Sequence, residues 1–183
     1  MSNILLVCSL MGILFLNGGF VQESSAPSAE IQWVSIEEAA ALAQQDGKKI
    51  LVDVYTDWCG WCKRMDKTTY QDAKIAEYIN QNYHAVKFNA EQKGDITVGG
   101  VTYKYLPNAG RRGVHELAAK MLNGRMSYPA TIFFEPNLSI ITNVPGYQQA
   151  GDMIVILSFL AEDAFKKDIP FDTYQKTFKG RKS

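Results

Sequence analysis

The sequence has few cysteines and no excess of charge of either sign. Of its 183 residues three are cysteine, and nineteen Lys and Arg are balanced by nineteen Asp and Glu, so the formal net charge is zero. A balanced chain has no overall field that would attract nucleic acid or an anionic membrane, and we expect no nucleic-acid partner. The composition, 46% hydrophobic and 21% charged, is that of a globular protein with one well-buried core.

The chain also lacks a hydrophobic run long enough to cross a membrane. Its apolar stretch at residues 4–16 has thirteen residues, whereas a spanning helix needs about 20. A run of that length followed by small polar residues is typical of a secretory signal peptide. We therefore expect residues 1–29 to be a signal peptide and linker, although no Lys or Arg precedes Lys48. This predicts export, to the periplasm in a bacterium; an uncleaved N-terminus would instead anchor the protein to a membrane.

Loss of the N-terminal segment would remove Cys8 and leave Cys59 and Cys62. A bridge between residues so close in sequence restricts the unfolded chain little, so the pair suits switching between dithiol and disulfide better than stapling a fold. Half of a zinc site has the same spacing, but zinc needs further ligands. Since His84 and His115 belong to no second ligand pair, we expect no metal and no cofactor; zinc binding and a structural bridge are the alternatives.

Local patterns place the cysteine pair between a buried strand and a helix. Residues 50–55 are apolar and β-branched on both faces, which predicts a central strand, and Asp53 is the anomaly within it. Residues 59–67 predict a helix that opens at Cys59. Cys62 follows three residues later on the same helical face, so its sulfur can reach that of Cys59.

Predicted helices and strands also alternate along the rest of the chain. They predict an α/β domain over residues 30–166, followed by a weakly patterned tail at 167–183. Ser35 begins a capping-box motif before the first helix. Gly99-Gly100 between two short β-rich segments predicts a hairpin. The other expected helices are 35–45, 72–79, 114–122 and 150–165, and the other expected strands are 84–88, 96–98, 101–103, 130–134 and 138–144.

The position of Cys59 at a helix start assigns a chemical order to the pair. The unpaired N–H groups and the dipole of a helix N-terminus stabilise a thiolate, which is the nucleophile in disulfide exchange. We expect Cys59 to attack a substrate disulfide and Cys62 then to attack Cys59, which releases the reduced substrate. Gly60 between them lets a partner backbone approach closely. The same steps in reverse would donate a disulfide.

Residues 50–63 resemble the active-site strand and helix of the thioredoxin superfamily, with Trp61 in place of the family's usual proline. The likeness continues at 86–89, at 128–131 and at Gly146, and it covers most of residues 31–165. The resemblance implies a thioredoxin fold with a central mixed β-sheet flanked by helices, and an insertion near residues 94–113. It also implies a protein-disulfide oxidoreductase.

The same resemblance implies roles for two charged residues. Asp53 is similar to the buried carboxylate that relays a proton for the second cysteine, and Lys87 would be its charged partner. Burial in an apolar strand raises the pKa of a carboxyl group, which suits proton transfer near neutral pH. A carboxylate fixed by one structural hydrogen bond is the alternative for Asp53.

A substrate groove is also implied. Pro129 matches the cis-proline of the family, beside which the Tyr128 backbone would pair with an extended substrate segment. Trp58 and Trp61 would flank the reactive sulfur as apolar contact surface. The insertion at 94–113 is our candidate for partner selection, and a solvated loop is its alternative.

The leading hypothesis is an exported reductase whose partners are protein disulfides or dithiols and an upstream electron donor, because the Asp53 match favours reduction. An oxidant or isomerase would use the same chemistry in another direction. A redox-inactive thioredoxin-fold binding module would use the groove alone.

Overall fold

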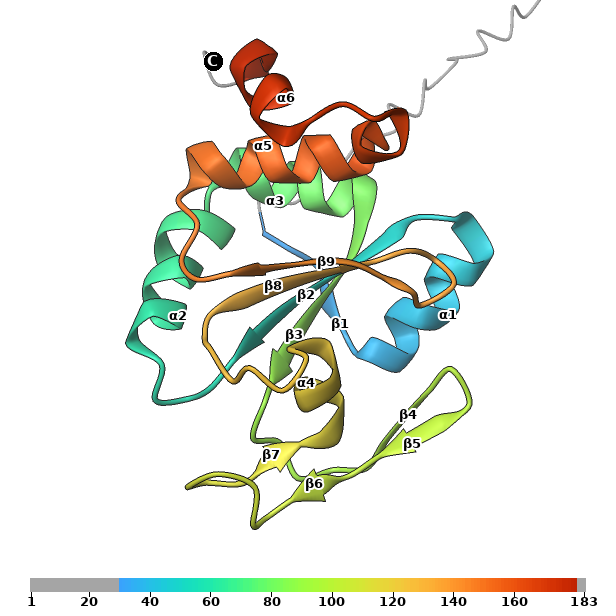
Figure 1. Cartoon of the computed structure of the whole chain (residues 1–183), viewed down its shortest axis with the longest axis vertical. Coiled ribbons are helices and arrows are strands. Elements are labelled where there is room, and N and C mark those ends of the chain that lie inside the picture. Colours follow the sequence, from blue (N-terminus) through green and yellow to red (C-terminus); the bar gives the residue numbers. More distant parts are fainter. Residues whose placement is uncertain (1–29, 181–183) are drawn as a thin grey trace, which may run out of the picture.

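The computed structural model describes residues 30–180, which form a five-stranded mixed sheet covered by helices on both faces (Figure 1). The strands run in the order β1, β3, β2, β8, β9 across the sheet. The first three are parallel, and β8 and β9 are each antiparallel to the preceding neighbour in that order. Their bounds are β1 Trp33–Val34, β3 Tyr83–Asn89, β2 Lys49–Tyr55, β8 Ala130–Phe134 and β9 Ile140–Pro145.

Side-chain alternation along β2 divides the core into two halves. Ile50, Val52 and Val54 pack on the face covered by α1 (Ile36–Asp46) and α4 (Glu116–Met121). Leu51 packs on the opposite face, which is covered by α3 (Ala73–Asn82) and α5 (Ala150–Ala161). Because successive strand residues point to opposite faces, Asp53 falls on the same side as Leu51. The charge that interrupts the apolar strand is thus buried on the α3 and α5 side.

The helix boundaries follow the caps expected from the sequence. The Ser35 hydroxyl accepts a hydrogen bond from the Glu38 N–H at the start of α1, and Asp72 caps α3. The predicted strand and helix around the cysteines are also confirmed, with α2 at Gly60–Met65 and Cys59 as its N-cap. Beyond α2 the chain continues into a π-helical turn, η1, at Asp66–Tyr70.

Three expected boundaries are wrong, and one of them is the end of the helix expected at 150–165, since α5 ends at Ala161. Val114 and His115 form a short strand, β7, rather than the first turn of a helix, and α4 begins only at Glu116. The cause is His115, whose Nδ1 accepts the Leu117 N–H and caps the helix. Strand β9 begins at Ile140 because Leu138 adopts a φ of 68° in the preceding turn.

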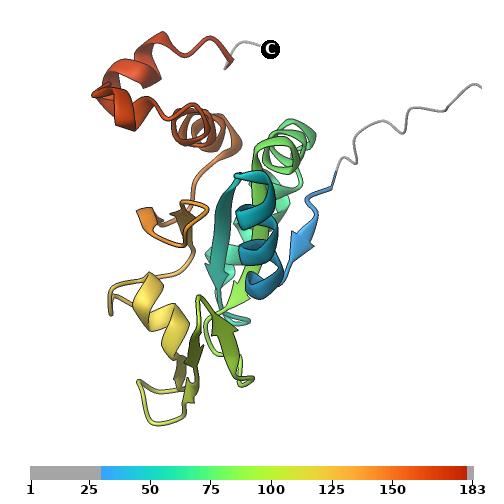
Figure 2. The same cartoon turned by 90° about the vertical axis from the view of Figure 1, so that its right-hand side faces the viewer.

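The insertion after β3 contains two small hairpins. One pairs β4 (Ile96–Val98) with β5 (Val101–Tyr103), as Gly99-Gly100 predicted. The other pairs β6 (Tyr105–Leu106) with β7 (Val114–His115). At the C-terminal side, η2 (Ala164–Lys167) and α6 (Phe171–Thr177) follow α5. The two views place α6 and the β6–β7 hairpin at opposite ends of the molecule (Figures 1 and 2).

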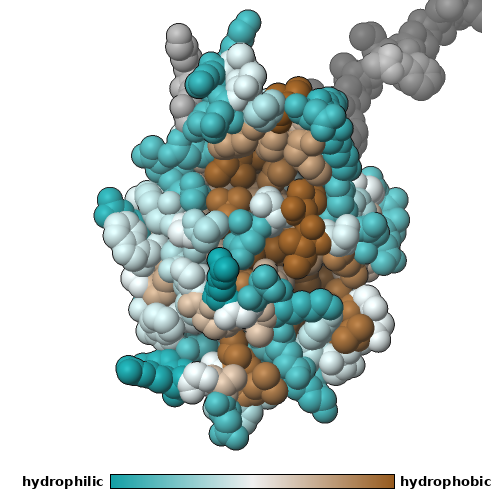
Figure 3. All heavy atoms as spheres, in the orientation of Figure 1, coloured by the Kyte–Doolittle hydropathy of each residue, from teal (hydrophilic) through white to brown (hydrophobic). Residues whose placement is uncertain are grey.

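Hydrophobic side chains gather between β9 and the C-terminal helices on the face shown in Figure 3. They line a groove of about 490 Å³ that includes Ile141, Val144 and Phe159. Of the helices between residues 30 and 180, none combines the length and the apolar character that crossing a bilayer requires. The predicted signal peptide, with Cys8, lies outside the described residues.

Candidate active site

Cys59 and Cys62 are joined as a disulfide at the junction of β2 and α2. Their Cα atoms lie 5.3 Å apart. The Cys59 sulfur accepts a hydrogen bond from the Cys62 N–H at 3.1 Å, so it occupies the place of a capping side chain at the helix start. Cys59 is 6% exposed and Cys62 is 2% exposed. Gly60 is exposed at the first helical position, and a Cβ there would meet no other atom.

The Asp53 carboxylate is almost fully buried, at 1% exposure, and its Oδ2 receives a hydrogen bond from the Lys87 ammonium at 2.7 Å. Strand register places the two residues side by side, since Asp53 is the partner of Lys87 in the parallel β2–β3 pair. Within residues 30–180 the second oxygen, Oδ1, is buried and accepts no hydrogen bond. Burial raises the pKa of Asp53 to about 6, against the opposing pull of Lys87.

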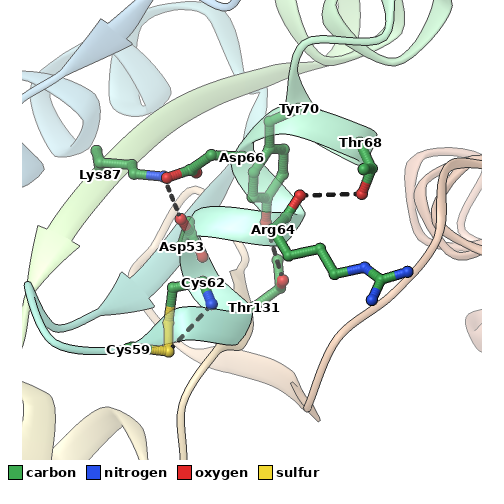
Figure 4. Close-up of polar contacts among 9 residues, drawn as sticks. All are labelled: Asp53, Cys59, Cys62, Arg64, Asp66, Thr68, Tyr70, Lys87 and Thr131. Atoms are coloured by element: carbon green, nitrogen blue, oxygen red, sulfur yellow. Dashed lines mark hydrogen bonds and ion pairs between the residues drawn. A yellow bond between two sulfur atoms is a disulfide. The ribbon is translucent and has the colours of Figure 1, made fainter.

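Asp66 completes a charged group that sequence reasoning did not find. Its carboxylate also accepts from the Lys87 ammonium, so one cation is shared by a buried and a half-exposed acid. Burial lowers the pKa of Lys87, but its pairing with both acids outweighs this and the pKa is raised overall. In Figure 4 the Asp53 side chain lies between Lys87 and the turn that carries Cys62.

Three aromatic rings surround the shared Lys87 ammonium, which lies beside a cavity. The Lys87 ammonium lies 5.2 to 5.4 Å from the ring centroids of Trp33, Tyr55 and Tyr70. Trp33, Asp66, Tyr70 and Lys87 line a cavity of about 630 Å³. The buried carboxylate is therefore connected through Lys87 and Asp66 to a polar opening, which offers a route for protons between Asp53 and water.

Two of the predicted groove residues, Trp58 and Tyr128, are in contact. The Tyr128–Pro129 peptide is cis, as the resemblance implied. The Tyr128 ring meets that of Trp58 edge-on at 5.9 Å between centroids. The Trp58 indole is 53% exposed, and its N–H donates a hydrogen bond to Glu91 at 2.8 Å.

Trp61 has a different set of neighbours. It is 56% exposed and lies against the Tyr147 ring at 5.6 Å. The Arg64 guanidinium covers the Trp61 ring at 5.2 Å, and the Tyr147 hydroxyl hydrogen-bonds to Thr68. Cation–π contact of this kind holds a large apolar side chain in place at the surface.

The two histidines are occupied elsewhere. His84 pairs with Asp46 at 3.0 Å. His115 is buried, with Nε2 at 3.0 Å from the Gly94 carbonyl and Nδ1 capping α4, which corrects its expected place inside a helix. In the part of the chain that the structure describes, no group of three or more His, Cys, Asp or Glu side chains is arranged to hold a metal ion.

Some of the missed residues had a signal in the sequence and others had none. Asp66 follows Cys62 by four positions, and Arg64 follows Trp61 by three, so each pair shares a helix face. By contrast, Glu91 is 33 residues from Trp58, and no local pattern connects them.

The chain is similar to proteins of known families. A family model described as "Thioredox_DsbH: Protein of unknown function, DUF255" matches residues 20–159. Thiol:disulfide interchange protein DsbD of Vibrio vulnificus is 33% identical over 73 residues, 36% of this chain and 12% of that protein. Its namesake in Salmonella typhi is 32% identical over 81 residues, 42% of this chain and 14% of that protein. The aligned segment thus spans less than a sixth of these relatives' length.

Solved structures share the fold. A DsbH oxidoreductase has a TM-score of 0.53 at 21% identity, over 78% of this chain and 92% of that one. A thioredoxin-fold protein from Helicobacter pylori has a TM-score of 0.54 at 16% identity, over 74% of this chain and 83% of that one. The predicted thioredoxin fold is confirmed, and the chain is related to thioredoxin-like disulfide oxidoreductases with a close cysteine pair.

Proposed function

This chain belongs to the Thioredox_DsbH family, and we propose from that premise that it reduces disulfides in exported proteins through Cys59 and Cys62. The observation that carries the proposal is the buried Asp53 beside the cysteine pair, with a pKa of about 6. A carboxylate with that pKa accepts a proton near neutral pH and returns it as readily. Two segments of DsbD proteins, which are named for thiol:disulfide interchange, support the same chemistry.

The first step is attack by the Cys59 thiolate on one sulfur of a substrate disulfide. A Cys59–substrate bond forms, the substrate S–S bond breaks, and the departing substrate thiolate takes a proton from water. Cys59 is suited to this step because it is the more exposed cysteine and caps the start of α2.

The second step is attack by Cys62 on the Cys59 sulfur. Asp53 accepts the Cys62 thiol proton as the new S–S bond forms, and the mixed disulfide breaks to release the second substrate sulfur as a thiolate, which takes a proton from water. Two electrons have then passed from the cysteine pair to the substrate. Asp53 then loses its proton to solvent through the polar opening that Asp66 and Lys87 line, and Lys87 stays protonated as the partner of both carboxylates. An upstream dithiol donor reduces the Cys59–Cys62 disulfide again.

We place this activity outside the cytoplasm. Support comes from the apolar stretch at residues 4–16, which the sequence predicts to be a signal peptide, and from the persistence of disulfides in oxidising compartments. Detection of the protein in a periplasmic fraction, against a cytoplasmic marker, tests the placement.

Trapping tests the activity. A Cys62→Ser variant completes only the first step, so it should accumulate in cells as a mixed disulfide with its substrates on Cys59. Cys59→Ser is the matched control and should trap nothing. Failure of the wild-type protein to reduce insulin with a chemical electron source, together with no trapped partner, would rule out the proposal and leave a binding module.

The direction of electron flow has its own measurement. A reductase keeps the Cys59–Cys62 pair mostly as a dithiol in cells, which alkylation of free thiols detects. A pair found mostly as the disulfide would contradict the reductase proposal and indicate a disulfide donor.

A further inference from the structure

Residues 104–115 form the β6–β7 hairpin and its connecting loop, and part of this segment lines a cavity together with Trp58, the residue before Cys59. We call residues 104–115 the arm. The Tyr105 hydroxyl donates to the Arg112 carbonyl across the loop. A Cβ on Gly113, whose φ is 76°, would collide with that hydroxyl, so glycine lets the Tyr105 ring lie against the chain. Backbone bonds from His115 to Ala90 at 2.8 Å and from Glu116 to Lys104 at 2.8 Å fix the base of the arm.

The arm forms one wall of a cavity of about 580 Å³. Arg111, Arg112 and Gly113 line it from the arm, while Trp58 and Tyr128 line it from the active site. Trp58 immediately precedes Cys59 and Tyr128 immediately precedes the cis proline, so the cavity includes two residues of the predicted substrate groove.

The charge on this wall is unbalanced. Arg111 and Arg112 are both exposed, and no salt bridge within residues 30–180 joins either guanidinium to an acid. The acid that lines the cavity is Glu91, and one of its oxygens already accepts the Trp58 N–H. Guanidinium groups are planar donors that match carboxylates, so the cavity favours an acidic occupant.

We propose that the arm selects partner proteins in which an acidic segment flanks the reactive disulfide. The carboxylates of that segment pair with Arg111 and Arg112 while the disulfide lies at Cys59. Attraction of this kind speeds encounter and fixes the register of the bound chain, more than it adds affinity. The inference rests on the proposed function for its substrate, and the test separates the two.

Three synthetic peptides, identical around one internal disulfide and flanked by Glu, Gln or Lys, provide the test. The pre-reduced full chain should reduce the Glu peptide about tenfold faster than the Lys peptide at low salt. The ratio should approach one at about 1 M salt, where charges are screened within about 3 Å.

Charge reversal supplies the decisive comparison. The R111E/R112E double variant should invert the Glu-to-Lys rate ratio, because the wall then repels carboxylates. The matched control is K176E/K179E, which changes net charge equally at the opposite end of the molecule and should keep the wild-type ratio (Figures 1 and 2). An equal ratio in the wild type and in R111E/R112E would overturn the inference.

A binding measurement keeps the inference testable without catalysis. In a C59S/C62S protein, a cysteine-free Glu peptide should shift the NMR signal of the Trp58 indole N–H, and the Lys peptide should not. If the wild type reduces none of the peptides but this shift is present, the proposed reductase is wrong and the binding of acidic segments by the arm still holds. If all three peptides are reduced at one rate and the shift is absent, the arm does not select acidic segments, and the proposed reductase still holds.

Discussion

The ammonium group of Lys87 lies 2.7 Å from the carboxylate of Asp53 and is shared with the more exposed Asp66. The three groups act on one another because they meet in a low-dielectric interior. The buried acid keeps a raised pKa of about 6 even with a cation in contact, since the loss of hydration outweighs the ion pair.

Substitutions of Lys87 and of Asp66 should shift the pKa of Asp53 in opposite directions. Lys87→Met removes the cation that lowers the pKa of Asp53, so the pKa should rise. Asp66→Asn removes a charge that raises it and leaves Lys87 to Asp53 alone, so the pKa should fall. The measurement is the pH profile of mixed-disulfide resolution by Cys62. A shift of the same sign in both variants would contradict the proposed coupling.

The wild-type protein should lose stability as pH rises, because Asp53 becomes ionised in a buried site. The Asp53→Asn variant should not show this loss. The folded-state pKa of about 6 lies above the ordinary value of 3.8 for an aspartate, so the folded protein binds the proton more tightly than the unfolded chain does. This contribution is present below pH 4 and is lost as pH rises through 6, by about 3 kcal/mol in all. At pH 8 the variant should therefore unfold at higher denaturant concentration than the wild type, yet resolve mixed disulfides more slowly.

The control for Asp53→Asn is Asp57→Asn, which removes an exposed carboxylate four residues away and leaves Asp53 in place. Denaturant titrations from pH 4 to pH 8 should show the wild-type decline in this control. A decline of equal size in Asp53→Asn would show that another group causes it.

Trp58→Phe should weaken substrate capture without changing the chemical step. The substitution keeps an apolar ring but removes the N–H that donates to Glu91 at 2.8 Å. With the ring no longer fixed at the surface, KM for a peptide disulfide should rise by about three- to tenfold, which corresponds to the net contribution of one hydrogen bond of ordinary strength. Steady-state kinetics measure it, and an equal fall in kcat at constant KM would contradict this role.

Gly113→Ala should distort the arm. The added Cβ collides with Tyr105, and alanine also pays for a φ of 76°. We expect a loss of stability above about 1 kcal/mol and a reduced Glu-to-Lys peptide ratio. Reaction with a small aromatic disulfide should be unchanged because the cysteines are untouched.

Gly110→Ala is the matched comparison for this glycine. Its φ is 67°, but a Cβ there meets no atom within 4 Å. It should therefore show only the backbone cost, of about 1 kcal/mol, and keep the peptide ratio. Equal losses from both substitutions would exclude the Tyr105 contact as the cause.

Much of the fold could be predicted because its elements carry local signals. The alternating core of β2, the Ser35 and Asp72 caps and the Gly99-Gly100 hairpin each depend on neighbours in sequence. β7 has two residues, too few for any period, and it pairs with β6 across a loop at 107–113 that is longer than the two-residue turn of a readily recognised hairpin. The helix at Phe171–Thr177 was missed because its packing partner, Phe159, lies in α5.

The site residues also differ in whether a local sequence signal identifies them. Cys59, Cys62 and Asp53 could be found because each departs from its surroundings in sequence, and Lys87 followed from the family resemblance. The contact between Trp58 and Glu91 depends on how the chain after β3 returns to the active site. The placement of Arg111 and Arg112 in the cavity likewise depends on the folded position of the arm, which no local pattern predicts.

The arm holds its shape through Tyr105, Gly113 and backbone bonds at its base, none of which involves the cysteines or Asp53. Partner choice and electron transfer therefore reside in separable parts of one small protein. Mutations on the arm can change which partner proteins are bound while Cys59, Cys62 and Asp53 stay the same. Grafting a different loop between β6 and β7 is a direct way to engineer that change.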